Sequence, residues 1–157
     1  MRRYLRNLLR RRPRTQRPIR NMSWSTHRSL QIDALESRRL LAATAHYSAG
    51  ELTVTGDSND NDIAVTFQNY GGTRYLIVRD GATTIFDGTS DGQNVEKSDV
   101  ARITVNGAAG NDAITLGDVQ SANGFTGLTD SIFVGGDEGD DSIVGSHFND
   151  TMSGGAG

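Results

Sequence analysis

Three aspartates near the C-terminus recur in phase with glycine and apolar residues. Asp112, Asp141 and Asp150 each stand five residues after a glycine and two residues before a large apolar side chain. The template is G-G-x-G-x-D-x-U-x, with U apolar. Three stretches fit it: GAAGNDAIT at 107–115, GDEGDDSIV at 136–144 and GSHFNDTMS at 145–153. Carboxylates repeated at this spacing have the chemistry of ligands for a hard cation.

The spacing also predicts the backbone that would position these carboxylates. Glycines permit tight turns and close approach of neighbouring turns, and each turn leads into a very short strand. The apolar residues Ile114, Ile143 and Met152 then stack as a thin core. Stacking brings carboxylates and main-chain carbonyls into a column of oxygens, and Ca²⁺ accepts six to eight such ligands. We therefore expect calcium to act as a structural cofactor of the fold.

Residues 106–157 resemble the calcium-binding nonapeptide repeats of RTX, or hemolysin-type, proteins. The resemblance implies a parallel β-roll in which calcium lies between turns on the same side, two units apart. That geometry pairs the turn at 136–141 with the turn that opens at 154. The implied ligands are the Asp112, Asp141 and Asp150 side chains and the carbonyls of Gly107, Gly110, Gly136, Gly139, Gly145, Gly155 and Gly157.

The last four residues, GGAG at 154–157, open a fourth unit. Solenoids need a capping segment at each end. We therefore expect this chain to be a fragment of a longer protein, with weak calcium affinity in the piece given.

Residues 46–105 are rich in β-branched residues and predict a small antiparallel β segment leading into the repeats. Gly71 with Gly72, and Asp80 with Gly81, are turn signals typical of hairpins. The expected strands lie at 52–55, 63–67, 75–78, 83–86 and 103–105.

The acidic stretch 57–62 has partial EF-hand spacing. Asp62 stands where that loop needs glycine and Gln68 where it needs the bidentate glutamate, so the pattern fails. Residues 56–64 align better as a degenerate nonapeptide, with Asn61 at the aspartate position. A solvated acidic turn is the preferred interpretation, with metal binding as the alternative.

Residues 1–45 form a basic leader with 12 arginines against two acids, whereas residues 46–157 carry 17 acids against four basic residues. The leader is expected to be disordered, with a partly helical stretch at 29–43. Its segment ALESRRLLAA resembles the export leader of planctomycete extracellular proteins. The small-x-small sequence 43–45 suggests cleavage after Ala43 or Ala45. A plain arginine-rich tail and a nucleic-acid-binding arm are the alternatives, and the acidic body argues against the latter.

Composition and missing motifs narrow the function further. Cysteine is absent, which excludes disulfides and cysteine-based zinc sites. No zinc-protease, nucleophile-elbow or phosphate-loop motif occurs, and no apolar run is long enough to span a membrane.

We accordingly expect an all-β, extracellular calcium-binding protein that is not an enzyme. A cell-surface or matrix component would be its partner if the alternative, an adhesion or matrix module, holds. Binding of nucleic acid or an anionic surface through the arginine-rich leader is the less favoured alternative. Nothing in the sequence indicates an oligomer.

Overall fold

The computed structural model describes residues 43–90, 94–129 and 132–157. They belong to a unit spanning Ser37–Gly157. Apart from two 3-10 turns, η1 (Lys97–Asp99) and η2 (Ser121–Asn123), their regular structure is all β. The all-β prediction is therefore confirmed at this level. The predicted leader lies outside the described residues except for its last three positions.

The ten strands form two mixed five-stranded sheets. The first has the order β1 (Thr44–Ser48), β2 (Glu51–Thr55), β6 (Arg102–Asn106), β8 (Ile132–Gly135) and β10 (Asp150–Ser153). The second has the order β5 (Thr83–Asp87), β4 (Thr73–Asp80), β3 (Asp62–Tyr70), β7 (Ala113–Thr115) and β9 (Ser142–Val144).

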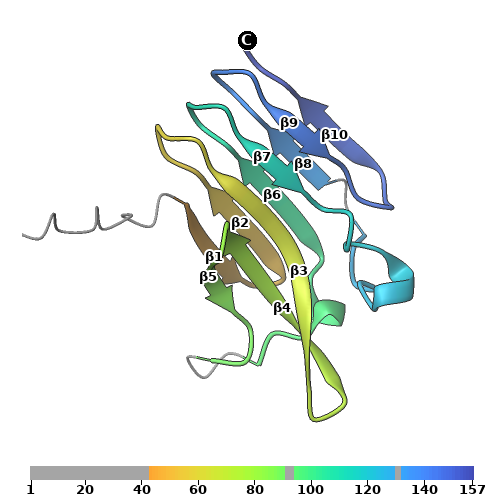
Figure 1. Cartoon of the computed structure of the whole chain (residues 1–157). Coiled ribbons are helices and arrows are strands. Elements are labelled where there is room, and N and C mark those ends of the chain that lie inside the picture. Colours follow the sequence, from red (N-terminus) through yellow and green to blue (C-terminus); the bar gives the residue numbers. More distant parts are fainter. Residues whose placement is uncertain (1–42, 91–93, 130–131) are drawn as a thin grey trace, which may run out of the picture. The chain divides into compact units, whose positions relative to one another are not determined.

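The strands predicted from residues 46–105 lie within β2, β3, β4, β5 and β6. The hairpin pairs β1·β2, β3·β4 and β4·β5 are antiparallel. All other strand pairings are parallel. They join β2, β6, β8 and β10 in one sheet and β3, β7 and β9 in the other. From β6 onward the chain passes from one sheet to the other at every strand (Figure 1).

Strand β1 begins at Thr44, one residue before the predicted end of the leader. It pairs with β2 along its whole length, and Ala43 just before it is 1% exposed. Ala45 and Tyr47 pack against the core. A cut after Ala43 would fall at the start of this strand, and a cut after Ala45 would fall inside it.

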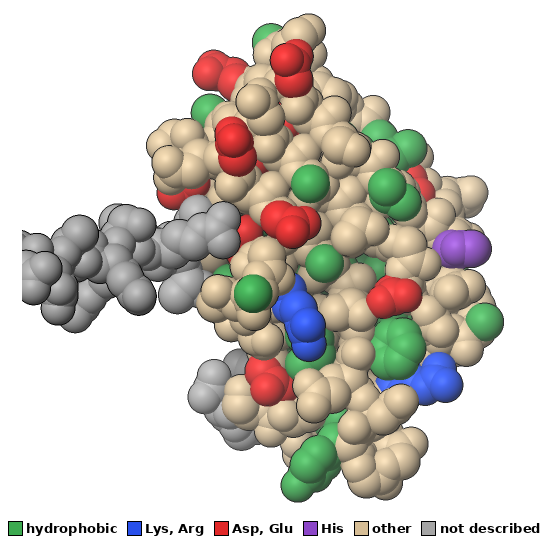
Figure 2. All heavy atoms as spheres, viewed as in Figure 1, with side chains coloured by type: hydrophobic (Ala, Val, Ile, Leu, Met, Phe, Trp, Pro, Cys, Tyr) green, Lys and Arg blue, Asp and Glu red, His purple; other side chains and the backbone are tan. Residues whose placement is uncertain are grey.

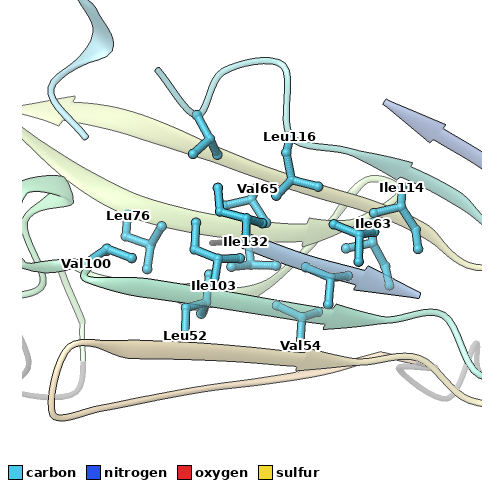
Figure 3. Close-up of a cluster of buried hydrophobic side chains, with 14 of the residues drawn as sticks. Leu52, Val54, Ile63, Val65, Leu76, Val100, Ile103, Ile114, Leu116 and Ile132 are labelled. Atoms are coloured by element: carbon cyan, nitrogen blue, oxygen red, sulfur yellow. The ribbon is translucent and has the colours of Figure 1, made fainter. Parts of the chain in front are cut away.

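The core lies between the two sheets and follows from the alternation of apolar and polar residues along each strand. In β2 and β6, buried Leu52 and Val54 face the same interior as their register partners Ile103 and Val105. In the other sheet, Ile63 is paired with Ile114. Figure 3 shows Leu52, Val54 and Ile103 of the first sheet converging with Ile63 and Ile114 of the second.

The predicted stacking core holds for two of its three residues. Ile114 is buried and Ile143 packs against the core, but Met152 is 54% exposed. Met152 is the register partner of buried Val134 and therefore faces the same side. Because β10 is the outermost strand of its sheet, no neighbouring strand covers Met152, and the prediction that it is buried is wrong.

Candidate metal centre at the stacked turns

Four turns lie against one another; three of them connect a strand of the first sheet to a strand of the second, and the fourth follows β10. We call them the turn column, and they comprise residues 56–61, 107–112, 136–141 and 154–157. Ala109 forms a parallel bridge with Glu138, and Glu138 forms one with Ala156. The Ala109 amide donates to the Asp57 carbonyl. Main-chain contacts therefore hold each turn to the next.

A ladder of side-chain hydrogen bonds runs through the column. The main-chain amide of Asn61 donates to Asp112 Oδ1 at 2.8 Å, and the main-chain amide of Asp112 donates to Asp141 Oδ1 at 2.9 Å. A second ladder lies beside it, in which Asp60 Oδ1 accepts from the Asn111 amide and Asn111 Oδ1 accepts from the Asp140 amide. In the first ladder a side-chain oxygen accepts from the turn before it, and in the second ladder a side-chain oxygen accepts from the turn after it.

In two turns of the column, the first glycine makes room for the aspartate. A Cβ at Gly107 would overlap the Asp112 carboxylate, and one at Gly136 would overlap the Asp141 carboxylate. The five-residue spacing between glycine and aspartate in the motif therefore corresponds to a direct packing contact between these two residues. A Cβ at Gly56 would meet the Asn61 side-chain oxygen in the same way, which supports the alignment of 56–64 as a degenerate nonapeptide.

The third glycine allows the turns to approach closely. Gly139 has φ of +125°, which favours glycine, and a Cβ there would overlap the Gly110 carbonyl oxygen. A Cβ at Gly110 would likewise overlap the main chain of Asn59. Main-chain carbonyls consequently line the space between adjacent turns.

Two carboxylate oxygens in the column are buried without a hydrogen-bond partner. They are Oδ2 of Asp112, whose residue is 2% exposed, and Oδ2 of Asp141. Burial raises the pKa of Asp112, the Asn61 amide lowers it, and the charges of Asp141, Asp60 and Asp57 raise it further. The column therefore holds carboxylate oxygens that the described protein atoms leave uncompensated.

The turn column carries seven acids and no lysine or arginine. In Figure 2, acidic side chains occur along the upper left edge, where these turns lie in Figure 1, and basic side chains lie lower. Across the parts of the chain that the structure describes, no three His, Asp or Glu side chains gather as a metal site. A cation in the column would therefore need main-chain carbonyl ligands as well.

The structure separates the predicted ligands into two groups. Those brought into the column are Asp112, Asp141, Gly107, Gly110, Gly136, Gly139, Gly155 and Gly157. Gly145 lies instead in the turn from β9 to β10, which runs from the second sheet to the first, and Asp150 is the first residue of β10. The Asp150 carboxylate accepts from the amide and hydroxyl of Ser146 in its own turn.

The structure also brings in residues that were not among the predicted ligands. Asn61 is 2% exposed and accepts from the Asp57 amide, so it is a buried part of the column. Its five-residue spacing from Gly56 was the available signal. The acids of that turn, Asp57 and Asp60, remain wholly or partly accessible to solvent, as expected. Asn111, which links two turns, had no distinguishing signal in the sequence.

The described residues contain no helix that is both long and apolar enough to cross a membrane. Comparison of the chain with protein-family models, with curated proteins and with solved structures finds no match in any of the three.

Proposed function

We propose that this chain binds Ca²⁺ in the turn column and that the ion acts as a structural cofactor. The observation that carries the proposal is the pair of buried, unpartnered oxygens, Asp112 Oδ2 and Asp141 Oδ2, in adjacent turns. A buried carboxylate without a compensating partner is costly. A cation bound between the two carboxylates would compensate their charges, and the carboxylates would then coordinate the ion together instead of repelling each other.

The donor set favours calcium over other biological cations. Only oxygen donors are offered, from carboxylates and main-chain carbonyls, and Ca²⁺ tolerates such mixed, irregular sets at high coordination number. Zinc and copper prefer nitrogen or sulfur ligands, and Mg²⁺ demands stricter octahedral geometry. The residues present therefore fit Ca²⁺.

The proposed site lies between the turns at 107–112 and 136–141. Each contributes one carboxylate, and the carbonyls of Gly110 and Gly136 are main-chain donors between the same two turns. The pair expected from the sequence, 136–141 with 154–157, has a carboxylate on one side only. It is therefore the weaker candidate.

We further propose that residues 106–157 begin a parallel β-roll of the RTX type. Support comes from the parallel register of β6, β8 and β10, the alternation of strands between sheets, and the repeated glycine-to-aspartate packing. In this proposal the chain has a structural, cation-dependent role outside the cell and no catalytic step. Extracellular modules bind calcium at about 10⁻⁴ to 10⁻³ M, which suits a site with two carboxylates.

Thermal unfolding of the full chain, followed by circular dichroism, tests the proposal. Millimolar Ca²⁺ added to chelator-treated protein should raise the unfolding midpoint, with a smaller rise for Mg²⁺ at equal concentration. If 10-fold more calcium than the affinity range of about 10⁻⁴ to 10⁻³ M leaves the midpoint unchanged, the proposal fails.

A further inference from the structure

Lys97 is a buried cation that lies outside the turn column. It lies in η1, is 2% exposed, and its Nζ has no hydrogen-bond partner. The Nζ atom lies 3.8 Å from the centroid of the Phe67 ring and 5.5 Å from that of Phe125. These ring faces stabilise the ammonium in part, but they accept no conventional hydrogen bond.

A second cation lies beside it. The Arg74 guanidinium is 5.2 Å from the same Phe67 ring, and its Nη1 donates to the carbonyls of Asn123, at 2.9 Å, and Ala122. Neither cation forms an ion pair with a carboxylate of the described residues. Two of the four basic residues in the acidic body are thus placed together without a bonded counter-charge.

The nearby carboxylates are engaged elsewhere. Asp118 accepts from the Thr66 hydroxyl at 2.6 Å and is exposed, so it attracts Lys97 only at a distance. The Glu96 side chain accepts from the Asp99 amide at the start of η1. Neither supplies the missing partner of Nζ.

Both cations line an open pocket of about 310 Å³, together with Glu96, Asn123 and Gly124. A Cβ on Gly124 would lie 3.3 Å from Lys97 Nζ and would approach no atom outside the Lys97 side chain. The main chain of Gly124 therefore lies directly beside the Lys97 ammonium. Burial, and then the charge of Arg74, lower the pKa of Lys97 to about 8.

We propose that this pocket binds a small oxyanion, such as a sulfate, phosphate or carboxylate group, between Arg74 and Lys97. A tetrahedral or planar oxyanion supplies the acceptor that Nζ lacks, and the planar guanidinium of Arg74 suits such groups. The site lies toward the hairpin end of β3, because Arg74 follows the turn between β3 and β4, whereas the turn column precedes the start of β3. It is independent of the proposed calcium site.

The test is isothermal titration of the chelator-treated full chain with sodium sulfate, against sodium chloride at equal ionic strength. Methyl sulfate forms a second arm, because binding of this ester would indicate a sulfated or phosphorylated larger molecule, whereas binding of sulfate alone would indicate the free ion. We expect millimolar binding by the wild type and an approximately tenfold or greater loss in Lys97→Met and in Arg74→Gln. Arg79→Gln, an exposed arginine on the same strand, is the matched control and should bind like the wild type.

The pH dependence adds a readout that a merely structural lysine would not produce. Affinity should fall as pH rises past about 8, where the Lys97 ammonium loses its proton, and Lys97→Met should show no such fall. Absence of binding beyond the chloride control, or equal binding by Lys97→Met and the wild type, would overturn the proposal. If Lys97→Met does not fold, loss of sulfate binding in Arg74→Gln still tests the proposal. Calcium binding should persist in either variant.

Discussion

The turns at 136–141 and 145–150 come from consecutive nonapeptides with the same glycine-to-aspartate spacing, yet their aspartates have different partners. Asp141 reaches across to the Asp112 amide of a neighbouring turn and keeps one oxygen buried and unpartnered. Asp150 uses its carboxylate within its own turn, on Ser146. A match to the nonapeptide motif therefore places a carboxylate in a turn. That carboxylate becomes a candidate ligand only where another turn stacks against it on the same side of the fold.

The largest expected effect comes from forcing the stacked turns apart. Gly139→Ala would place a methyl group against the Gly110 carbonyl at a φ of +125°, so we expect a loss of about 3 kcal/mol in the free energy of unfolding. Gly154→Ala is the matched control, because its Cβ would meet nothing within 4 Å. Urea unfolding measures both. Equal losses in the two variants would contradict the role assigned to close stacking.

Replacing each aspartate by asparagine should change stability in opposite directions without calcium. Asp112→Asn removes a buried uncompensated charge and keeps an oxygen for the Asn61 amide, so we expect a gain of about 1 kcal/mol at neutral pH. Asp150→Asn weakens the hydrogen bonds from Ser146, so we expect a loss of about 1 kcal/mol. Urea unfolding in the presence of chelator measures both. A stability change of the same sign in both variants would contradict the difference in hydrogen-bond partners described for the two aspartates.

The raised pKa of Asp112 predicts a specific pH dependence without calcium. The folded protein holds this proton more tightly than the unfolded chain, whose carboxyl has the ordinary value of 3.8. Stability should therefore fall as pH rises from about that value through the raised pKa, and then stay level. The difference between wild type and Asp112→Asn isolates this effect from the other acids. A difference that does not grow with rising pH would count against burial of the charge.

A smaller effect concerns the second position of each turn. Asp137 has φ of +75° and Ala108 has φ of +77°, both in the left-handed region, whereas Gly155 occupies the equivalent position with φ of +87°. Asp137→Gly and Ala108→Gly should each stabilise the chain by up to about 1 kcal/mol, because non-glycine residues are strained there. Ser146, at the same position in the 145–150 turn, is outside this region, and Ser146→Gly should destabilise. Thermal unfolding in chelator measures all three.

The strands and the placing of Asp112 and Asp141 in the stacked turns could be predicted from the sequence because both depend on local spacing. Alternation in the segments 52–55 and 103–105 is enough to predict β2 and β6, and glycine-to-aspartate spacing identifies Asp112 and Asp141. The contact between 136–141 and 154–157 was expected from the repeat, and a main-chain bridge joins them. The contact between 107–112 and 136–141 could not be predicted, because the segment between β7 and β8 separates them in the sequence. Strand β1 was missed because its pairing with β2 decides its structure more than its composition does.

Calcium titration of Asp112→Asn beside Asp150→Asn tests the central claim most directly. The account predicts that Asp150→Asn binds Ca²⁺ with the affinity of the wild type, whereas Asp112→Asn loses about tenfold or more, since it removes one of the two carboxylates at the proposed site. Equal calcium affinity in the two variants, or loss in Asp150→Asn alone, would contradict the assignment of calcium to the turn column.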